Sequence, residues 1–171
     1  MDAESLKKDV GAAIDAMSAE LLGLSHAIHG EPELALEEFK AAKRLSDAVE
    51  SHGIQVQREA FGLKTAFAAE FGKAAGPNVA ILSEYDALPG IGHACGHNII
   101  ATSAYGAAMA LAKLNGRLPG RVREGGCGDD DASLQPQHRD HAVHRDLGSG
   151  SCVSRAFGAR LGDALSRAER A

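Results

Sequence analysis

The first part of the chain has the apolar spacing of an amphipathic helix. Over Ala3–Leu24 the apolar residues recur at steps of three and four, which places them on one face of a helix. The residues of this stripe are Leu6, Val10, Ile14, Met17, Leu21 and Leu24. We expect one continuous helix that extends to about His29, because Gly30 and Pro32 then break the pattern.

Further along, helical spacing alternates with short apolar runs that are bounded by turn residues. Leu45 and Val49 mark part of the buried face of a second helix, and Gly53 follows it as a stop signal. The elements predicted after the first helix are, in order, a helix over 36–51, strands over 54–61, 65–71 and 78–83, a helix over 98–114 and the start of a strand at 118–122. This order predicts an α/β fold.

The apolar run Val79–Leu82 distinguishes one predicted strand from the others. A near-continuous apolar strand is typical of a position covered on both faces, so we expect it at the centre of the sheet. In open α/β sheets, ligands bind beyond the carboxyl ends of such strands. Glu84, Tyr85 and Asp86, together with the loop that follows them, are therefore expected at a ligand site.

The character of the sequence changes near residue 122, which predicts a boundary between residues 1–122 and residues 123–171. The second part contains seven arginines but no lysine, isoleucine or tyrosine. Two interpretations stay open: a native disordered, low-complexity tail, and an out-of-frame translation of a GC-rich gene, which we favour. His138, His141 and His144 cluster in this part, but they are a weak metal-binding signal.

Charge and cysteine content restrict the partners and the compartment. The net charge of -5 offers no basic field for nucleic acid, and no apolar run approaches the roughly 18 residues that a membrane helix needs. Cys95, Cys127 and Cys152 are odd in number and far apart, which argues against a disulfide framework. We therefore expect a cytoplasmic protein with free thiols and with neither nucleic-acid nor membrane partners.

Two imidazoles, a thiol and two carboxylates lie close together in the segment Glu84–Asn98. Cys95 and His97 offer ligands that suit zinc and similar divalent ions, and the neighbouring glycines let the backbone bend around an ion. Two ligands alone do not make a zinc site. An inert thiol with loop-filling histidines therefore remains an alternative, as does a catalytic cysteine with a histidine partner.

The motifs EYDALPG at 84–90 and GHACGHN at 92–98 resemble the M20 family of metallopeptidases and amidohydrolases, in particular its p-aminobenzoyl-glutamate hydrolase and Xaa-Arg dipeptidase-like branch. Supporting segments are IHGEPEL at 28–34 with Glu37 and Glu38, TAF at 65–67 and GPNVA at 76–80. The resemblance covers roughly residues 15–122. It implies an incomplete zinc-peptidase-like catalytic domain, in which three layers are built around a mostly parallel central sheet. The polarity of residues 123–171 predicts a disordered tail after this domain.

The resemblance also implies a reaction: a pair of divalent ions, zinc or manganese, activates a water that attacks a small amide or dipeptide substrate. Carried over by position, Cys95 and His97 are metal ligands, and Asp86 orients a ligand from beside the metal site. Glu84 stands where other branches place a ligand histidine, and His93 belongs to the motif without being a ligand. The homodimer of the full-length family depends on an inserted domain, so it cannot be assumed for this chain.

The sequence departs from the family after Val122. A Pro-Ala-Glu-Glu-type motif, which supplies a general base and a metal ligand in the family, is replaced by Arg123-Glu124-Gly125-Gly126-Cys127. Without the base and the later ligands, water has no proton acceptor and the ions lose most of their cage. We therefore expect the chain to be inactive or nearly so, with weak metal binding through Cys95 and His97. Rival functions are a non-catalytic metal-binding module that uses the tail histidines, and a structural interaction fragment.

Overall fold

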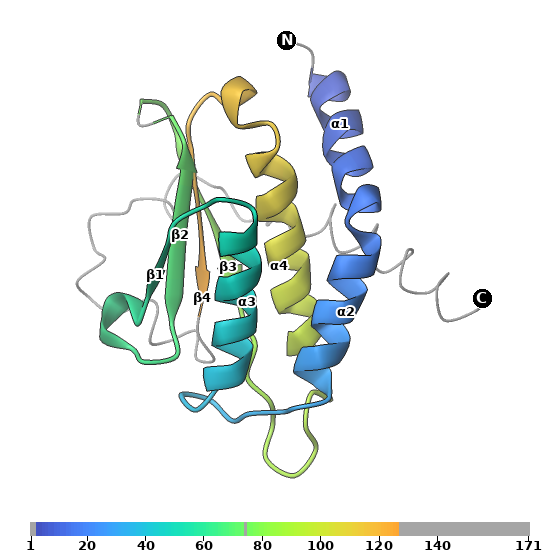
Figure 1. Ribbon diagram of the computed structural model, residues 1–171, viewed down its shortest axis with the longest axis vertical. Coiled ribbons are helices and arrows are strands. Elements are labelled where there is room, and N and C mark those ends of the chain that lie inside the picture. The colour runs from blue at the N-terminus through green and yellow to red at the C-terminus, as the bar shows by residue number, and fades with distance from the viewer. Residues whose placement is uncertain (1–2, 74, 127–171) are drawn as a thin grey trace.

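The computed structural model describes residues 3–73 and 75–126, which form four α-helices, four strands and two short 3-10 helices (Figure 1). The helices are α1 (Ala3–Ala16), α2 (Ser18–His29), α3 (Phe39–Ser51) and α4 (His97–Ala112). The strands are β1 (Val56–Arg58), β2 (Phe67–Gly72), β3 (Asn78–Ser83) and β4 (Arg121–Gly126), and the 3-10 helices are η1 (Ala60–Gly62) and η2 (Asn115–Arg117). The predicted α/β class is confirmed. No helix within these ranges has the length and apolar character needed to span a membrane.

The long helix predicted at the N-terminus is divided in two. Met17, between α1 and α2, has φ -100° and ψ 6°, and its N–H donates to Ile14 O at 2.9 Å in a tight turn. The apolar stripe continues across this break, since Ile14, Met17 and Leu21 are all buried. The apolar periodicity therefore predicted the buried face correctly. It did not predict the break at Met17, because a turn that keeps the same face buried does not change the spacing of the apolar residues.

α3 begins later than the predicted Leu36. The Glu33 carboxylate accepts the N–H groups of Lys40 and Ala41 at 2.9 and 3.0 Å, which satisfies donors that the first helical turn leaves free. Leu36 has φ 66°, a left-handed conformation that an α-helix excludes, and its N–H donates to Glu38 at 2.7 Å. The two glutamates therefore hold a fixed loop where the pattern predicted the start of a helix.

β4 lies between β2 and β3 in a sheet with the strand order β1–β2–β4–β3. β3 and β4 are parallel, with Asn78 opposite Arg121 and Ser83 opposite Gly126, whereas the β1–β2 and β2–β4 pairings are antiparallel. The prediction of a mostly parallel sheet is therefore wrong for the described residues. The short connection through η1 explains part of this, since strands that follow each other closely pair antiparallel.

The predicted central place of β3 is also wrong for the described part of the chain, where β3 is an edge strand that pairs with β4. Val79 and Leu82 are 37% and 50% exposed, so the apolar run is not covered on both faces. An apolar run indicates that a strand tolerates burial, but it does not determine which neighbours cover it.

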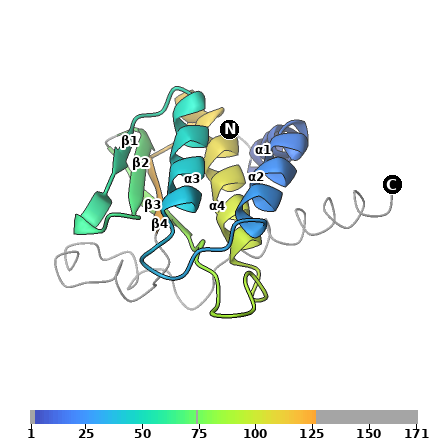
Figure 2. The same cartoon turned by 60° about the horizontal axis from the view of Figure 1, so that its bottom comes forward.

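All four helices lie on the same side of the sheet (Figures 1 and 2). α3 and α4 pack on the strands, and α1 and α2 pack against α4 on its far side. The sheet is thus not the middle of the three layers predicted around it, as far as residues 3–73 and 75–126 show. Its other face carries η1 over Ala68, and Glu70 forms ion pairs there with Arg121 and Arg123.

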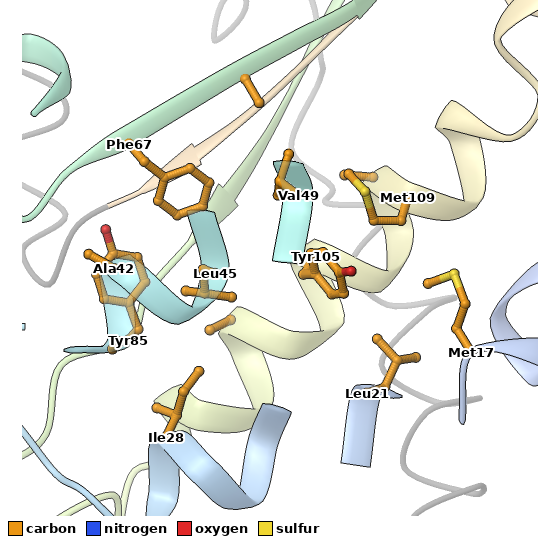
Figure 3. Packing of buried hydrophobic residues seen from close by; sticks show 14 of the residues in the cluster. Met17, Leu21, Ile28, Ala42, Leu45, Val49, Phe67, Tyr85, Tyr105 and Met109 are labelled. Carbon is orange, nitrogen blue, oxygen red and sulfur yellow. The ribbon is translucent and has the colours of Figure 1, made fainter. Parts of the chain in front are cut away.

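The core fills the space between the helices and the inner face of the sheet (Figure 3). Its large, fully buried apolar side chains include Leu21, Ile28, Leu45, Val49, Phe67 and Met109. α2 and α4 approach closely where Leu21 packs on Gly106, because a Cβ at Gly106 would lie 3.1 Å from a Leu21 methyl carbon. The alanines of α4 allow the same close contact with the surrounding helices and strands.

Tyr85 anchors the chain at the point where it leaves β3. Its ring is fully buried and stacks on Phe67 with the ring centroids 6.1 Å apart. Its hydroxyl lies 2.6 Å from the carbonyl oxygen of Thr65 and 2.5 Å from that of Gly126, so it can donate to either. The residue directly before Asp86 therefore contacts both the segment just before β2 and the end of β4.

Leu45→Ala is expected to lower the free energy of unfolding by about 2–5 kcal/mol, because it removes a fully buried side chain and leaves a cavity. Ile91→Ala, at a position that is 63% exposed, is the control and should change it by less than about 0.5 kcal/mol. Urea denaturation of both variants measures the difference. Equal effects of the two substitutions would contradict the packing described here.

Tyr85→Phe is expected to lower the free energy of unfolding by roughly 1–3 kcal/mol, because it leaves buried carbonyl oxygens without their donor while the ring remains. The same denaturation experiment measures this change. Stability within error of the unmodified chain would show that the hydroxyl does not hold β2, β3 and β4 together.

Candidate functional site

The predicted site loop lies where expected, between the carboxyl end of β3 and the start of α4 (Figure 1). It is held against the segment before α3, because Leu34 and Ala87 form an isolated parallel bridge and Ala87 N–H donates to Glu33 O at 2.7 Å. Gly96 directly precedes α4 with φ 82°, a left-handed conformation that favours glycine. The loop is thus fixed at both ends by backbone contacts.

His97 is flanked by the two carboxylates of the loop. Its Nδ1 lies 2.6 Å from Asp86 Oδ1, and its Nε2 lies 3.4 Å from Glu84 Oε2. A second contact joins Nδ1 to the backbone oxygen of Asp86 at 3.1 Å. An Nδ1–H that donates to Asp86 leaves the lone pair on Nε2, which is the arrangement that a metal-binding histidine needs.

Cys95 carries an exposed free thiol just before α4. Thiol, imidazole and carboxylate together form a donor set whose chemistry suits zinc, so Cys95 and His97 fit two ligand positions of such a centre. Among the described residues, however, no group of three or more histidine, cysteine, aspartate or glutamate side chains is arranged to hold a metal ion. The described residues therefore show no complete metal centre, and the ligand roles of Cys95 and His97 stay predictions.

His93 lies under the loop rather than on its surface. It is buried, and its ring centroid is 6.2 Å from that of His29. Burial, with smaller contributions from His29 and His97, holds the pKa of His93 below its usual value, so the neutral form is favoured. The prediction that His93 belongs to the motif without being a ligand stays a prediction.

A buried carboxyl that the sequence analysis used only as a supporting motif lies close to the site. Glu38 is fully buried, and burial raises its pKa against the opposing effect of hydrogen bonds from Thr65 and the Leu36 N–H. The negative charge of Asp86 raises the Glu38 pKa further, although less than burial does. A glutamate before a helical pattern is usually an exposed residue of the first turn, so the sequence carries no signal for the burial of Glu38 that the structure shows.

Glu124 occupies the region where the family resemblance places the general base. It is fully buried in β4, and neither of its carboxylate oxygens has a hydrogen-bond partner. Burial raises the pKa of Glu124 to about 8. Its side chain lies in the core rather than in the site loop, so it does not replace the missing base.

Several predicted features lie outside the described residues: Cys127, Cys152, His138, His141 and His144. The predicted boundary after Val122 falls within β4, which continues to Gly126. A hollow on the sheet, lined by residues that include Gln55, Gln57 and Arg123, contains none of the predicted site residues.

Sequence comparison finds relatives with related activities, although no family profile matches the chain. The chain is 45% identical over 120 residues to the Xaa-Arg dipeptidase of Mus musculus, a match that covers 63% of this chain and 27% of the relative. It is 34% identical over 127 residues to one of the p-aminobenzoyl-glutamate hydrolase polypeptides of Escherichia coli, over 64% of this chain and 26% of the relative. The chain thus spans about a quarter of the length of these curated relatives.

Comparison of the fold with solved structures finds similar proteins of related description. A Bacillus subtilis structure described as a dinuclear metal-binding peptidase from the M20 family matches with a TM-score of 0.60 and 31% identity, over 66% of this chain and 35% of that one. An aminobenzoyl-glutamate utilization protein from Klebsiella pneumoniae shares the fold with a TM-score of 0.59 at 16% identity, over 73% of this chain and 43% of that one. Across the matched residues, the chain belongs in sequence and in fold to the M20 family of peptidases and amidohydrolases.

Proposed function

We propose that this chain represents part of a metal-dependent hydrolase of amide or dipeptide bonds, in which Cys95 and His97 are metal ligands and Asp86 orients His97. The observation that carries this proposal is the position of His97, which contacts Asp86 through Nδ1 and faces Glu84 through Nε2 at the carboxyl end of a strand. The relatives named as a dipeptidase and as an amide hydrolase support the reaction class.

The ion in this proposal is a divalent metal, zinc or manganese, and the dinuclear metal-binding peptidase from Bacillus subtilis supports a pair of ions. Such an ion, when bound, lowers the pKa of a bound water and polarises the carbonyl that is attacked. Asp86 accepts the Nδ1–H of His97, which fixes the ring and keeps Nε2 available as a ligand. The exposed Cys95 supplies a thiolate from the adjoining turn.

The substrate class follows from the same relatives. Their names indicate small amides or dipeptides, one with arginine and one with p-aminobenzoyl-glutamate, so we infer a small amide or dipeptide substrate for this lineage. The net charge of -5 supports the absence of nucleic-acid partners. The free thiol of Cys95 supports a cytoplasmic location.

The 171-residue chain by itself is proposed to be inactive or nearly so. Its described residues do not complete a metal centre, and Glu124 lies in the core rather than beside the loop. Purified chain should therefore not hydrolyse an aminoacyl amide or a dipeptide when zinc or manganese is added. Metal-dependent hydrolysis that Cys95→Ser abolishes would refute the proposed inactivity and would support the ligand assignment.

Metal binding tests the ligands directly, without activity. Cobalt(II), added as a spectroscopic substitute for zinc, should bind weakly and give a thiolate-to-cobalt charge-transfer band. Cys95→Ser should remove the band, and His97→Ala should weaken cobalt binding below detection. Asp86→Asn should weaken binding by about 10–100-fold, because it disturbs the orientation of His97.

Matched controls come from residues of the same type outside the loop. His52→Ala removes a histidine that contacts Glu20 rather than the site, and Cys152→Ser removes a thiol far from the loop in sequence. Both should leave cobalt binding unchanged. Loss of the band in Cys152→Ser with retention in Cys95→Ser would assign the ligand to the C-terminal residues and favour the alternative of a non-catalytic metal-binding module.

A further inference from the structure

One acidic side chain is enclosed in the core without a partner. Glu124 lies in the middle of β4 and is fully buried, and neither carboxylate oxygen accepts a hydrogen bond. Its neighbours in the sheet are Ala69 of β2 and Ile81 of β3, both apolar. A charge in such a place costs far more than a neutral acid, so the protonated form is the one compatible with this fold.

The groups that face Glu124 do not compensate for a charge. β3 contains no titratable residue, and Glu70 of β2 is paired with Arg121 and Arg123 on the opposite face of the sheet. From α4 the titratable group nearby is Tyr105, whose pKa is raised by burial, by Glu20 and by Glu124. A negative charge on Glu124 would therefore meet a phenol that is already hydrogen-bonded to Glu20 and, within residues 3–73 and 75–126, no cation within hydrogen-bond distance.

We propose that Glu124 is a pH-dependent conformational switch: its neutral carboxyl permits β4 to remain at the centre of the sheet, and its ionisation displaces β4 and releases the site loop. This conformational change requires no reaction partner beyond the proton that leaves the carboxyl. It also does not depend on the proposed metal ligands, because Glu124 belongs to β4 and not to the site loop.

The connection from β4 to the site loop is short. Gly126, at the end of β4, accepts a hydrogen bond from the Tyr85 hydroxyl, and Tyr85 directly precedes Asp86. Gly126 also lies so close to β3 that a Cβ there would be 1.7 Å from Ser83 O. Displacement of β4 therefore removes both the partner strand of β3 and one anchor of Tyr85.

The direction of the pH effect follows from the raised pKa. Below its ordinary value of 4.5, the carboxyl of Glu124 is protonated in both the folded and the unfolded chain. Between this value and about 8, only the folded chain retains the proton, so the stability of the fold decreases as the pH rises. Above about 8 the loss is complete.

Urea denaturation of the full chain from pH 5 to pH 9, beside Glu124→Gln, tests the proposal. Glutamine has the same shape and does not titrate, so comparison of the two proteins cancels the contributions of Glu38 and His93. The unfolding constant of the unmodified chain divided by that of Glu124→Gln is expected to rise by up to about tenfold per pH unit between pH 5 and pH 8. A ratio that does not change with pH would overturn the switch.

A local measurement and a second variant distinguish the switch from a general loss of stability. In hydrogen exchange corrected for the intrinsic rates, the amides of 83–88 and 121–126 should lose protection at pH 8.5 before those of α1, and Glu124→Gln should prevent this loss. If the glutamine variant does not fold, Glu124→Met, which fits the apolar site, replaces it. This variant should likewise keep the amides of 83–88 and 121–126 protected at pH 8.5. Glu38→Gln is the control for a buried carboxyl and should leave the loss at 121–126 unchanged; uniform loss across the chain would overturn the proposal.

Discussion

The pairing of β3 with β4 is the constraint on which the rest of the described structure depends. β3 leads into the site loop, and within residues 3–73 and 75–126 its sheet partner is β4. β4 in turn joins β3 to the antiparallel half of the sheet, and Tyr85 adds a hydrogen bond from the loop back to Gly126. The geometry around His97 therefore depends on the pairing of one short strand, β4. This strand itself contains a buried acid, Glu124.

The sequence predicted much of the local structure and the location of the site. Leu21, Leu45 and Val49 lie in the core as their spacing predicted, and the loop after β3 has Asp86 beside His97. The parts that it did not predict depend on contacts between distant segments. The insertion of β4 beside β3 is set by pairing across the sheet, which no local apolar pattern encodes.

The sequence did not predict which way the side chains of some single residues point. Glu38 and Glu124 are acidic residues, a type that usually indicates a solvent-exposed face, yet both are fully buried in the structure. Glu38 accepts a hydrogen bond from the chain, whereas neither oxygen of Glu124 has a partner. The ligand roles of Cys95 and His97 stay predictions that come from the resemblance, because their geometry alone does not complete a centre.

The late position of β4 in the chain sets an order of events during synthesis. β2 can pair with β1 early, because Phe67 lies opposite Arg58, but the second edge of β2 and the paired edge of β3 need β4, which is made last. A growing chain lengthens by about 5–20 residues per second. For several seconds, therefore, β2 and β3 exist without the strand that joins them, and their unpaired edges are open to other chains. Folding yield in the cell should accordingly depend on how fast β4 is synthesised, and not only on how stable the finished sheet is.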